Sequence, residues 1–220
     1  DGELRGIAWP SVLVWEDGAR ETLNDRVLRP AGDPFQATGG LSVLRGSLGT
    51  GVMKVSAVKP ERHVVEAPAR VFDGQEAVRA AFRAGELDRD VVVVVRYQGP
   101  KANGMPELHS LSPQLAVLQD RGFKVALVTD GRMSGASGKV PSAIHVCPEA
   151  LDGGPLAHLR DGDLVRVDAV EGRLDVLTEG LMERPVTHPD LSMRRSGTGR
   201  ELFDVFRSHV GPAAEGACVA

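Results

Sequence analysis

The stretch VALVTDGRMSGASGKVPSAIHVCPE, residues 125–149, decides how the rest of the chain is interpreted. Its first four residues, Val125 to Val128, are all apolar and two of them are β-branched valines, which predicts a short buried strand. The following loop has glycines at 131, 135 and 138 and also carries Ser134, Ser137 and Lys139. Because glycine has no Cβ, such a loop can bring backbone N–H groups and hydroxyls close to a ligand. The same glycines also suit a tight turn without a ligand, and composition alone leaves both interpretations open.

Length and composition are those of an ordinary globular protein. The 220 residues can bury a core, and 42% of them are hydrophobic and 25% charged. A formal net charge of −4 gives no electrostatic case for nucleic acid or an anionic membrane. No apolar run approaches the length of a membrane span, and no signal peptide is recognisable. Two cysteines, Cys147 and Cys218, make neither a disulfide framework nor an iron–sulfur site by themselves, so we expect a reduced, cytoplasmic setting.

Short strands separated by glycine-rich turns are expected in the first 72 residues. The predicted strands cover residues 11–15, 26–28, 41–48, 52–58 and 64–72, and a surface loop covers residues 30–40. The chain begins at Asp1 without an initiator Met, from which we expect a fragment of a longer protein. No internal repeat or linker stands out, and we expect one domain of mixed strands and helices over residues 1–220.

The hydrophobic period changes to that of a helix over residues 74–84. The run of five valines at 91–95 then predicts a strand that is buried on both faces. Pro106 suits a helix start, and the leucines at 108, 111, 115 and 118 give that helix an apolar face up to Gly122. A helix between two such strands predicts that the strands are parallel.

The last third of the chain alternates between strands and short helices. We expect a strand at 141–146, a helix within 148–159, and a hairpin of residues 164–170 and 173–177 around Glu171 and Gly172. Thr198 and Glu201 have capping-box spacing, and apolar residues at 202, 203, 205, 206 and 210 continue at helical spacing. A closing helix is therefore predicted, followed by a frayed tail from Gly211.

Several nucleotide and hydrolase motifs are excluded by spacing. A Walker loop needs Ser or Thr after its Lys, but Val140 follows Lys139, and the spacing of the glycines differs as well. Neither Ser134 nor Ser137 has the flanking glycines of a hydrolase elbow. The sequence contains no HExxH, CxxC or GxGxxG pattern, so zinc-protease, zinc-ribbon and dinucleotide-binding functions lack support.

Two long motifs carry a family resemblance. Residues 128–150, VTDGRMSGASGKVPSAIHVCPEA, resemble the C-terminal signature of the dihydroxy-acid and sugar-acid dehydratases. Residues 98–109, QGPKANGMPELH, are most similar to the 6-phosphogluconate branch, since dihydroxy-acid dehydratases typically carry Glu in place of Gln98. Shorter matches extend the resemblance along nearly the whole chain, at residues 39–40, 52–57, 66–68 and 198–203.

The resemblance implies a fold, a reaction and a cofactor. The chain would be the C-terminal third of the enzyme, a mixed α/β, barrel-like swivelling β/β/α domain flanked by helices and similar to the C-terminal domain of aconitase. The implied reaction removes water from 6-phospho-D-gluconate and gives 2-dehydro-3-deoxy-6-phosphogluconate. An iron–sulfur cluster, of the 4Fe–4S type, would be held by an N-terminal domain absent from this chain, with a divalent cation such as Mg²⁺ nearby. A homodimer is implied, and the isolated chain is expected to be inactive.

The resemblance also implies residue roles. Ser134 matches the serine that acts as an alkoxide base, and Glu107 matches a carboxylate that reaches the divalent metal. Residues expected to bind the substrate are Ser137, Lys139, Asn103 and Lys101. Structural alternatives are a loop serine at 134, an exposed lysine at 139 and a first-turn glutamate at 107 that complements a helix dipole. Asp130 and Arg132 are expected to pair and brace the loop.

Two other function classes stay open at this point. One is the same chemistry on another sugar acid or on a dihydroxy acid. The other is a non-catalytic binding module that kept the fold.

Overall fold

In a computed structural model, the structure describes residues 21–133, 138–186 and 188–219. The chain divides into two compact units, residues 1–39 and residues 40–220. The described part of the first unit, residues 21–39, consists of turns and irregular chain, so the predicted surface loop is confirmed and the strand at 26–28 is wrong. Val27 and Leu28 instead donate backbone hydrogen bonds to Asn24 and have exposed side chains. The strand predicted at 11–15 lies outside the described residues.

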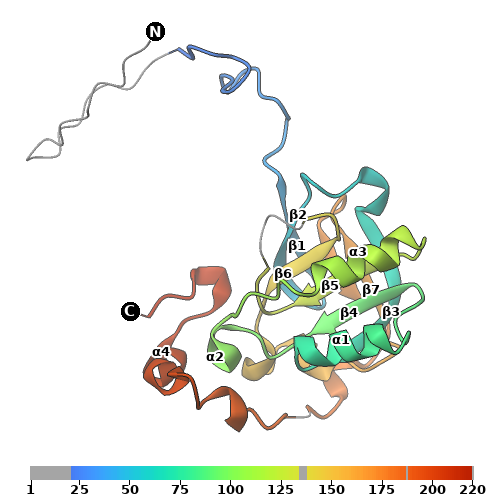
Figure 1. Cartoon of the computed structure of the whole chain (residues 1–220), viewed down its shortest axis with the longest axis vertical. Helices are drawn as coiled ribbons and strands as arrows, with labels where there is room; N and C mark the ends of the chain where they lie inside the picture. Colours follow the sequence, from blue (N-terminus) through green and yellow to red (C-terminus); the bar gives the residue numbers. More distant parts are fainter. Residues whose placement is uncertain (1–20, 134–137, 187, 220) are drawn as a thin grey trace, which may run out of the picture. The chain divides into compact units, whose positions relative to one another are not determined.

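The second unit contains a closed barrel of eight strands (Figure 1). The order around the barrel is β1, β2, β6, β5, β4, β3, β7, β8. The strands are β1 (Leu41–Gly46), β2 (Gly49–Lys54), β3 (Val64–Phe72), β4 (Val91–Val95), β5 (Val125–Thr129), β6 (Ser142–Cys147), β7 (Leu164–Asp168) and β8 (Arg173–Val176). Neighbours from β3 through β4 and β5 to β6 are parallel, and β7 and β8 form the predicted antiparallel hairpin. The predicted mixed α/β, barrel-like architecture is confirmed.

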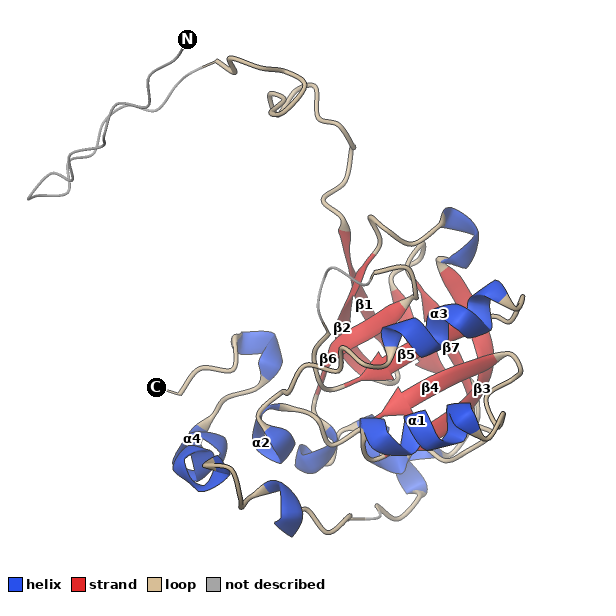
Figure 2. Cartoon of the chain, viewed as in Figure 1, coloured by secondary structure: helices blue, strands red, loops and turns tan. Residues whose placement is uncertain are grey.

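Helices are few and short (Figure 2). The α-helices are α1 (Gln75–Arg83), α2 (Pro100–Asn103), α3 (Ser112–Asp120) and α4 (Asp204–His209). The 3₁₀ turns are η1 (Pro60–Arg62), η3 (Ala150–Asp152), η4 (Pro155–His158), η5 (Leu181–Glu183), η6 (Ser192–Arg194), η7 (Arg200–Phe203) and η8 (Ala213–Glu215). In the part of the chain that the structure describes, no helix has both the length and the apolar character needed to cross a bilayer.

Two hydrophobic cores lie on the two faces of the parallel strands. Val92 and Val94 of β4 belong to the core inside the barrel, whereas Val91, Val93 and Val95 belong to the core beneath α1 and α3. This division follows from the two-residue period of a strand, which points successive side chains to opposite faces. The prediction that residues 91–95 are buried on both faces is confirmed.

The helix predicted from Pro106 begins only at Ser112. The cause is a strand-like contact: Glu107 forms a parallel bridge with Arg132, and the Leu108 N–H donates to the Arg132 carbonyl at 3.0 Å. Leu108 and Leu111 are still fully buried, so the leucine pattern identified the apolar residues but not the helix start.

The last predicted helices are also broken into shorter pieces. The expected helix within 148–159 is two 3₁₀ turns, η3 and η4, and the closing helix is η7 followed by α4. The capping box does not form, because Glu201 accepts a hydrogen bond from the Gly197 N–H at 2.6 Å and the Thr198 hydroxyl donates to the Gly197 carbonyl. The tail expected to fray contains η8 and a hydrogen bond from the Gly211 N–H to the Cys218 carbonyl.

A pair of substitutions on α3 tests how this helix packs on the barrel. Leu115 is fully buried in the outer core, whereas Val117, two residues on, is 41% exposed. We expect Leu115→Ala to lower the free energy of unfolding by about 2–5 kcal/mol, because it leaves a cavity. The control, Val117→Ala, should change it by less than about 0.5 kcal/mol. Equal effects in chemical denaturation would show that α3 does not pack as described.

Candidate functional site

The candidate site lies at one edge of the barrel. Because β4, β5 and β6 are parallel neighbours, their carboxyl ends meet at the same edge, where ligands bind in many folds with parallel strands. The segments that leave this edge begin at Arg96, Asp130 and Pro148. They contain all the residues that the sequence singled out for chemistry.

A buried carboxylate ties these three segments together. Asp130 follows β5 directly, and its side chain is fully buried. Its Oδ2 accepts hydrogen bonds from the N–H groups of Tyr97 at 3.1 Å and Ala150 at 2.9 Å, and its Oδ1 accepts from Gln98 at 2.9 Å. Burial raises the pKa of Asp130, while the three N–H donors act in the opposite direction. The predicted pairing of Asp130 with Arg132 is wrong, because Asp130 binds backbone N–H groups and Arg132 Nε donates to the Met105 carbonyl.

A second buried carboxylate holds α2 at this edge. Glu149 Oε1 accepts from the Lys101 N–H at 2.9 Å and Oε2 from the Ala102 N–H at 3.2 Å, which are donors of the first helical turn. Glycine at 99 makes room for this carboxylate, since a Cβ there would lie 2.0 Å from Glu149 Oε2 and would displace it. Burial raises the pKa of Glu149 to about 7, although the two N–H donors oppose the shift.

The two predicted substrate-binding residues on α2 already have protein partners. Lys101 Nζ donates to Asp152 at 2.8 Å, a half-exposed ion pair that raises the pKa of Lys101. Asn103 donates to Gln98 Oε1 at 2.9 Å and accepts from Arg200 Nη2 at 2.5 Å. Both side chains therefore lie at the candidate edge, and a ligand would have to share or replace these partners.

Gln98 is part of the framework of this edge. Its side chain is buried, and Nε2 donates to the carbonyls of Asp73 at 2.9 Å and Arg96 at 3.1 Å. With Oε1 accepting from Asn103, the amide uses both its donor and its acceptor groups. It thereby joins the ends of β3 and β4 to α2.

Glu107 lies beside the strand that leads into the glycine-rich loop. Its backbone bridges to Arg132, two residues before Ser134 in the sequence. The alternative that Glu107 complements a helix dipole is wrong, since Glu107 is not in a helix. Among the described residues its half-buried carboxylate has no hydrogen-bond or ion-pair partner, so its oxygens are available to a cation.

Of the three predicted residues in the glycine-rich loop, the structure describes only one. Ser134 and Ser137 lie outside the described residues. Lys139 is described, and it is exposed in the turn that leads to Val140. The structure therefore brings Lys101, Asn103 and Glu107 to one edge and leaves the two serines as predictions.

The residues that the structure describes do not make a complete metal centre. Within residues 21–133, 138–186 and 188–219, no three His, Cys, Asp or Glu side chains come together to hold an ion. Cys147 is buried, Cys218 is exposed, and both are free thiols. The described residues thus do not fit an iron–sulfur cluster, whereas Glu107 fits the role of one oxygen ligand among several.

Sequence reasoning missed the arginines that approach this edge from the C-terminal segment. Arg194 Nη1 donates to the Tyr97 carbonyl at 2.5 Å, and its Nη2 donates to the Asp73 carbonyl. Arg200 Nε donates to the Arg194 carbonyl at 2.5 Å and its Nη2 reaches Asn103. Two signals were present in the sequence: the family match at residues 198–203, which contains Arg200, and the density of arginines at 194, 195 and 200, which is equally typical of a solvated surface.

Comparisons with known proteins identify close relatives. The family model described as "Dihydroxy-acid/6-phosphogluconate dehydratase C-terminal" matches residues 26–217. The chain is 61% identical over 207 residues to a phosphogluconate dehydratase of Pseudomonas aeruginosa, covering 94% of the chain and 34% of that protein. It is 58% identical to the phosphogluconate dehydratase of Escherichia coli, covering 93% and 34%, and 44% identical to a dihydroxy-acid dehydratase of Ignicoccus hospitalis, covering 76% and 30%. The chain thus spans about a third of the length of these relatives.

The hydrogen bonds of Asp130 can be tested with Asp130→Asn. The amide keeps one oxygen but turns an N–H donor toward one of the three backbone donors, so one donor loses its acceptor. We expect the free energy of unfolding at pH 7 to fall by about 1–3 kcal/mol. Asp152→Asn, which removes a half-exposed ion pair, should cost less than about 1 kcal/mol. Similar losses in the two variants would contradict the bracing role of Asp130.

The raised pKa of Glu149 predicts how stability depends on pH. Folding favours the protonated form of Glu149. The contribution of this group to the free energy of unfolding is therefore complete below the ordinary pKa of 4.5 and is lost as pH rises through about 7. Between pH 5 and pH 8 the free energy of unfolding should therefore fall more steeply in the wild type than in Glu149→Gln. Identical slopes for the two proteins in urea titrations across this range would refute the assignment.

Proposed function

Because the chain belongs to the dihydroxy-acid/6-phosphogluconate dehydratase C-terminal family, we propose that residues 1–220 are the C-terminal domain of a phosphogluconate dehydratase. The proposed enzyme removes water from 6-phospho-D-gluconate and gives 2-dehydro-3-deoxy-6-phosphogluconate, a step of the Entner–Doudoroff pathway. The observation that carries this choice is the 61% identity over 94% of the chain to a phosphogluconate dehydratase. Identity to the dihydroxy-acid dehydratase is lower and covers less of the chain, at 44% over 76%.

In this proposal Ser134 is the base. The C–H bond beside the substrate carboxylate breaks as its proton passes to Ser134 Oγ, and the neighbouring C–OH bond breaks as hydroxide leaves. The resulting enol takes up a proton on the carbon that lost the hydroxyl, loses the proton of its own O–H and becomes the 2-keto product; the departed hydroxide leaves as water after it takes up a proton. A serine hydroxyl is a weak base by itself, so the role requires stabilisation of the alkoxide by nearby N–H groups or a cation. The bridge between Glu107 and Arg132 supports this arrangement, because it holds a carboxylate beside the strand leading to Ser134.

The metal and cofactor follow from the same proposal. Glu107 would supply one oxygen ligand to a divalent cation such as Mg²⁺, which prefers oxygen ligands. An iron–sulfur cluster bound by sequence outside this chain would supply the Lewis acid for the departing hydroxyl.

Four polar residues are proposed to bind the substrate's carboxylate and phosphate. They are Lys101, Asn103, Ser137 and Lys139. Lys101 and Asn103 are supported by their place on α2 at the candidate edge, where lysine could bind an anion as a point charge. A barrel that swivels against an N-terminal domain, a homodimer and a cytoplasmic location belong to the same proposal.

Turnover by the full-length protein that contains this chain tests the proposal. Ser134→Ala should lower kcat for 6-phosphogluconate by about 10²-fold or more, because it removes the base. Glu107→Gln should raise the divalent-cation concentration for half-maximal activity by about tenfold. Ser192→Ala, at an exposed serine in η6, is the matched control and should stay within about twofold of the wild type.

The same assay separates the alternatives. A panel of sugar acids and dihydroxy acids should show highest kcat/KM for 6-phosphogluconate, and the isolated 220-residue chain should show no turnover and no iron-dependent absorbance. Absence of turnover with every acid would leave a binding module as the better account. Full activity of Ser134→Ala would refute Ser134 as the base.

A further inference from the structure

Four large apolar side chains near the C-terminus face solvent. In η7 and α4 the exposed fractions are 76% for Leu202, 58% for Phe203, 66% for Val205 and 53% for Phe206. The Phe203 and Phe206 rings lie against each other, with centroids 6.1 Å apart. The sequence predicted a closing helix with these apolar residues at helical spacing, and the structure leaves their side chains uncovered. We call these four residues the apolar face. A contiguous exposed set of this kind marks an interaction site.

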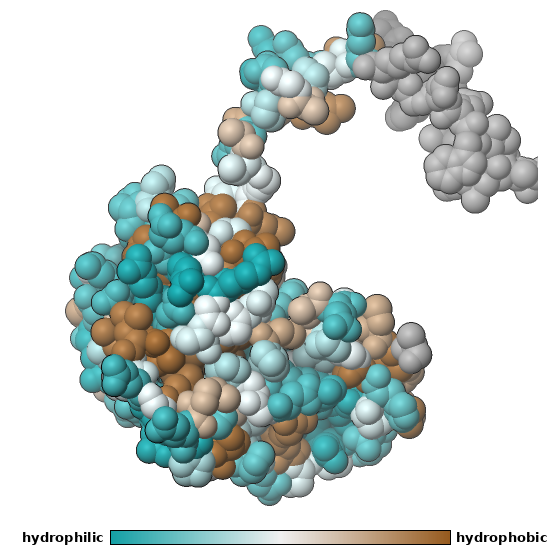
Figure 3. All heavy atoms as spheres, turned by 180° about the vertical axis from the view of Figure 1, so that it is seen from behind, coloured by the Kyte–Doolittle hydropathy of each residue, from teal (hydrophilic) through white to brown (hydrophobic). Residues whose placement is uncertain are grey.

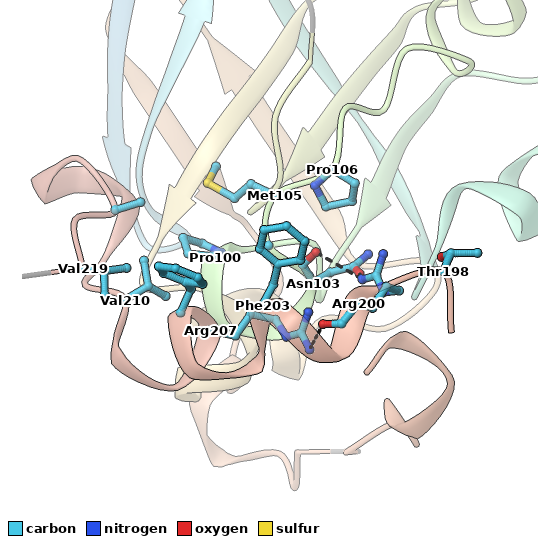
Figure 4. Close-up of a pocket in the computed structure, with 13 residues that line it drawn as sticks. Pro100, Asn103, Met105, Pro106, Thr198, Arg200, Phe203, Arg207, Val210 and Val219 are labelled. Carbon is cyan, nitrogen blue, oxygen red and sulfur yellow. Dashed lines mark hydrogen bonds between the residues drawn. The ribbon is translucent and has the colours of Figure 1, made fainter. Parts of the chain in front are cut away.

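The apolar face borders a cavity of about 580 Å³. Phe203 and Val210 line it from the C-terminal segment, and Pro100, Met105 and Pro106 line it from the segment around α2 (Figure 4). Phe206 also lines the cavity. α4 packs against α2, so the two segments belong to one compact unit. The reverse side of the molecule, in Figure 3, shows brown hydrophobic side chains in separate patches among teal hydrophilic ones.

The cavity also presents positive charge. Arg200 lines it, and its Nη2 donates to Asn103 Oδ1 at 2.5 Å (Figure 4). The same guanidinium donates to two further uncharged oxygens, the Arg194 carbonyl at 2.5 Å and the Asn103 carbonyl at 3.5 Å. Within the part of the chain that the structure describes, Arg200 makes no ion pair. Because guanidinium groups bind carboxylates through strong charge-assisted hydrogen bonds, an occupant with an acidic side chain would complement the cavity.

The cavity and the candidate site share one segment of chain. Residues 100, 103, 104, 105 and 106 line the cavity, and Glu107 follows directly. In the proposed function a second part of the enzyme must face Glu107 to complete the metal centre. The part of the enzyme that covers Glu107 would therefore lie next to the cavity and the apolar face.

We propose that the apolar face and its cavity dock the part of the dehydratase polypeptide that precedes this chain, through a segment with apolar and carboxylate side chains. This inference rests on the proposed function. Relatives are about three times as long as the chain, which covers 34% of their length, so they contain enough additional sequence to form such a body. A second copy of the barrel is less favoured, because it would not supply the missing metal ligands.

Photo-cross-linking in the full-length protein tests the proposal. A photoreactive benzoylphenylalanine replaces Leu202, or Val117 on α3 as the control. We expect a cross-link from position 202 that keeps the mass of one chain and maps to a peptide upstream of this sequence, with at least a tenfold lower yield from position 117. Arg200→Gln should reduce the yield at 202 severalfold, whereas Arg195→Gln, at an exposed neighbouring arginine, should not.

Each other outcome overturns the docking surface. A product of doubled mass would assign the face to a second copy, and a yield no higher than that at position 117 would show that nothing covers it. Hydrogen exchange of β4 and β5 checks that the variants are folded. Activity of the unmodified enzyme keeps the two proposals apart: turnover without the cross-link refutes only the docking surface, and the cross-link without turnover refutes only the proposed function.

Discussion

The candidate site depends on one buried carboxylate that accepts hydrogen bonds from the backbone of two other segments. Asp130 holds the N–H groups of Tyr97, Gln98 and Ala150, which come after β4 and β6. A carboxylate in this position satisfies donors that the strand ladders leave unpaired, and an unpaired buried N–H is costly. Every segment at this edge then has a fixed starting point. Without Asp130 the barrel could still close, but its loops would not share a common anchor.

The barrel itself is largely predictable from local patterns. The five valines of β4 and the apolar start of β5 leave no alternative to buried strands, and the hairpin of β7 and β8 follows from alternation around Gly172. The start of α3 was not predictable, because the contact of Glu107 with Arg132 joins residues that are 25 positions apart. Local propensity carries no information about such a pairing.

The candidate site could be predicted only in part. Motif similarity identified Lys101, Asn103 and Glu107, and the structure brings all three to the carboxyl edge of the parallel strands. It could not identify their protein partners, since the bonds of Asn103 depend on Gln98 and on an arginine almost a hundred residues away. Glu149 was missed for a similar reason, because a single acid after a strand looks like any surface glutamate until the fold buries it.

The close contact between Gly99 and Glu149 has a consequence for efforts to alter substrate preference. Any side chain at position 99 would displace Glu149, because a Cβ there would lie 2.0 Å from Glu149 Oε2. The backbone of α2, by contrast, is anchored through N–H groups of 101 and 102 and not through their side chains. A library should therefore vary positions 101 and 103, keep glycine at 99 and avoid proline at 101 and 102. Such variants would change the side chains at the candidate edge without moving the backbone of α2.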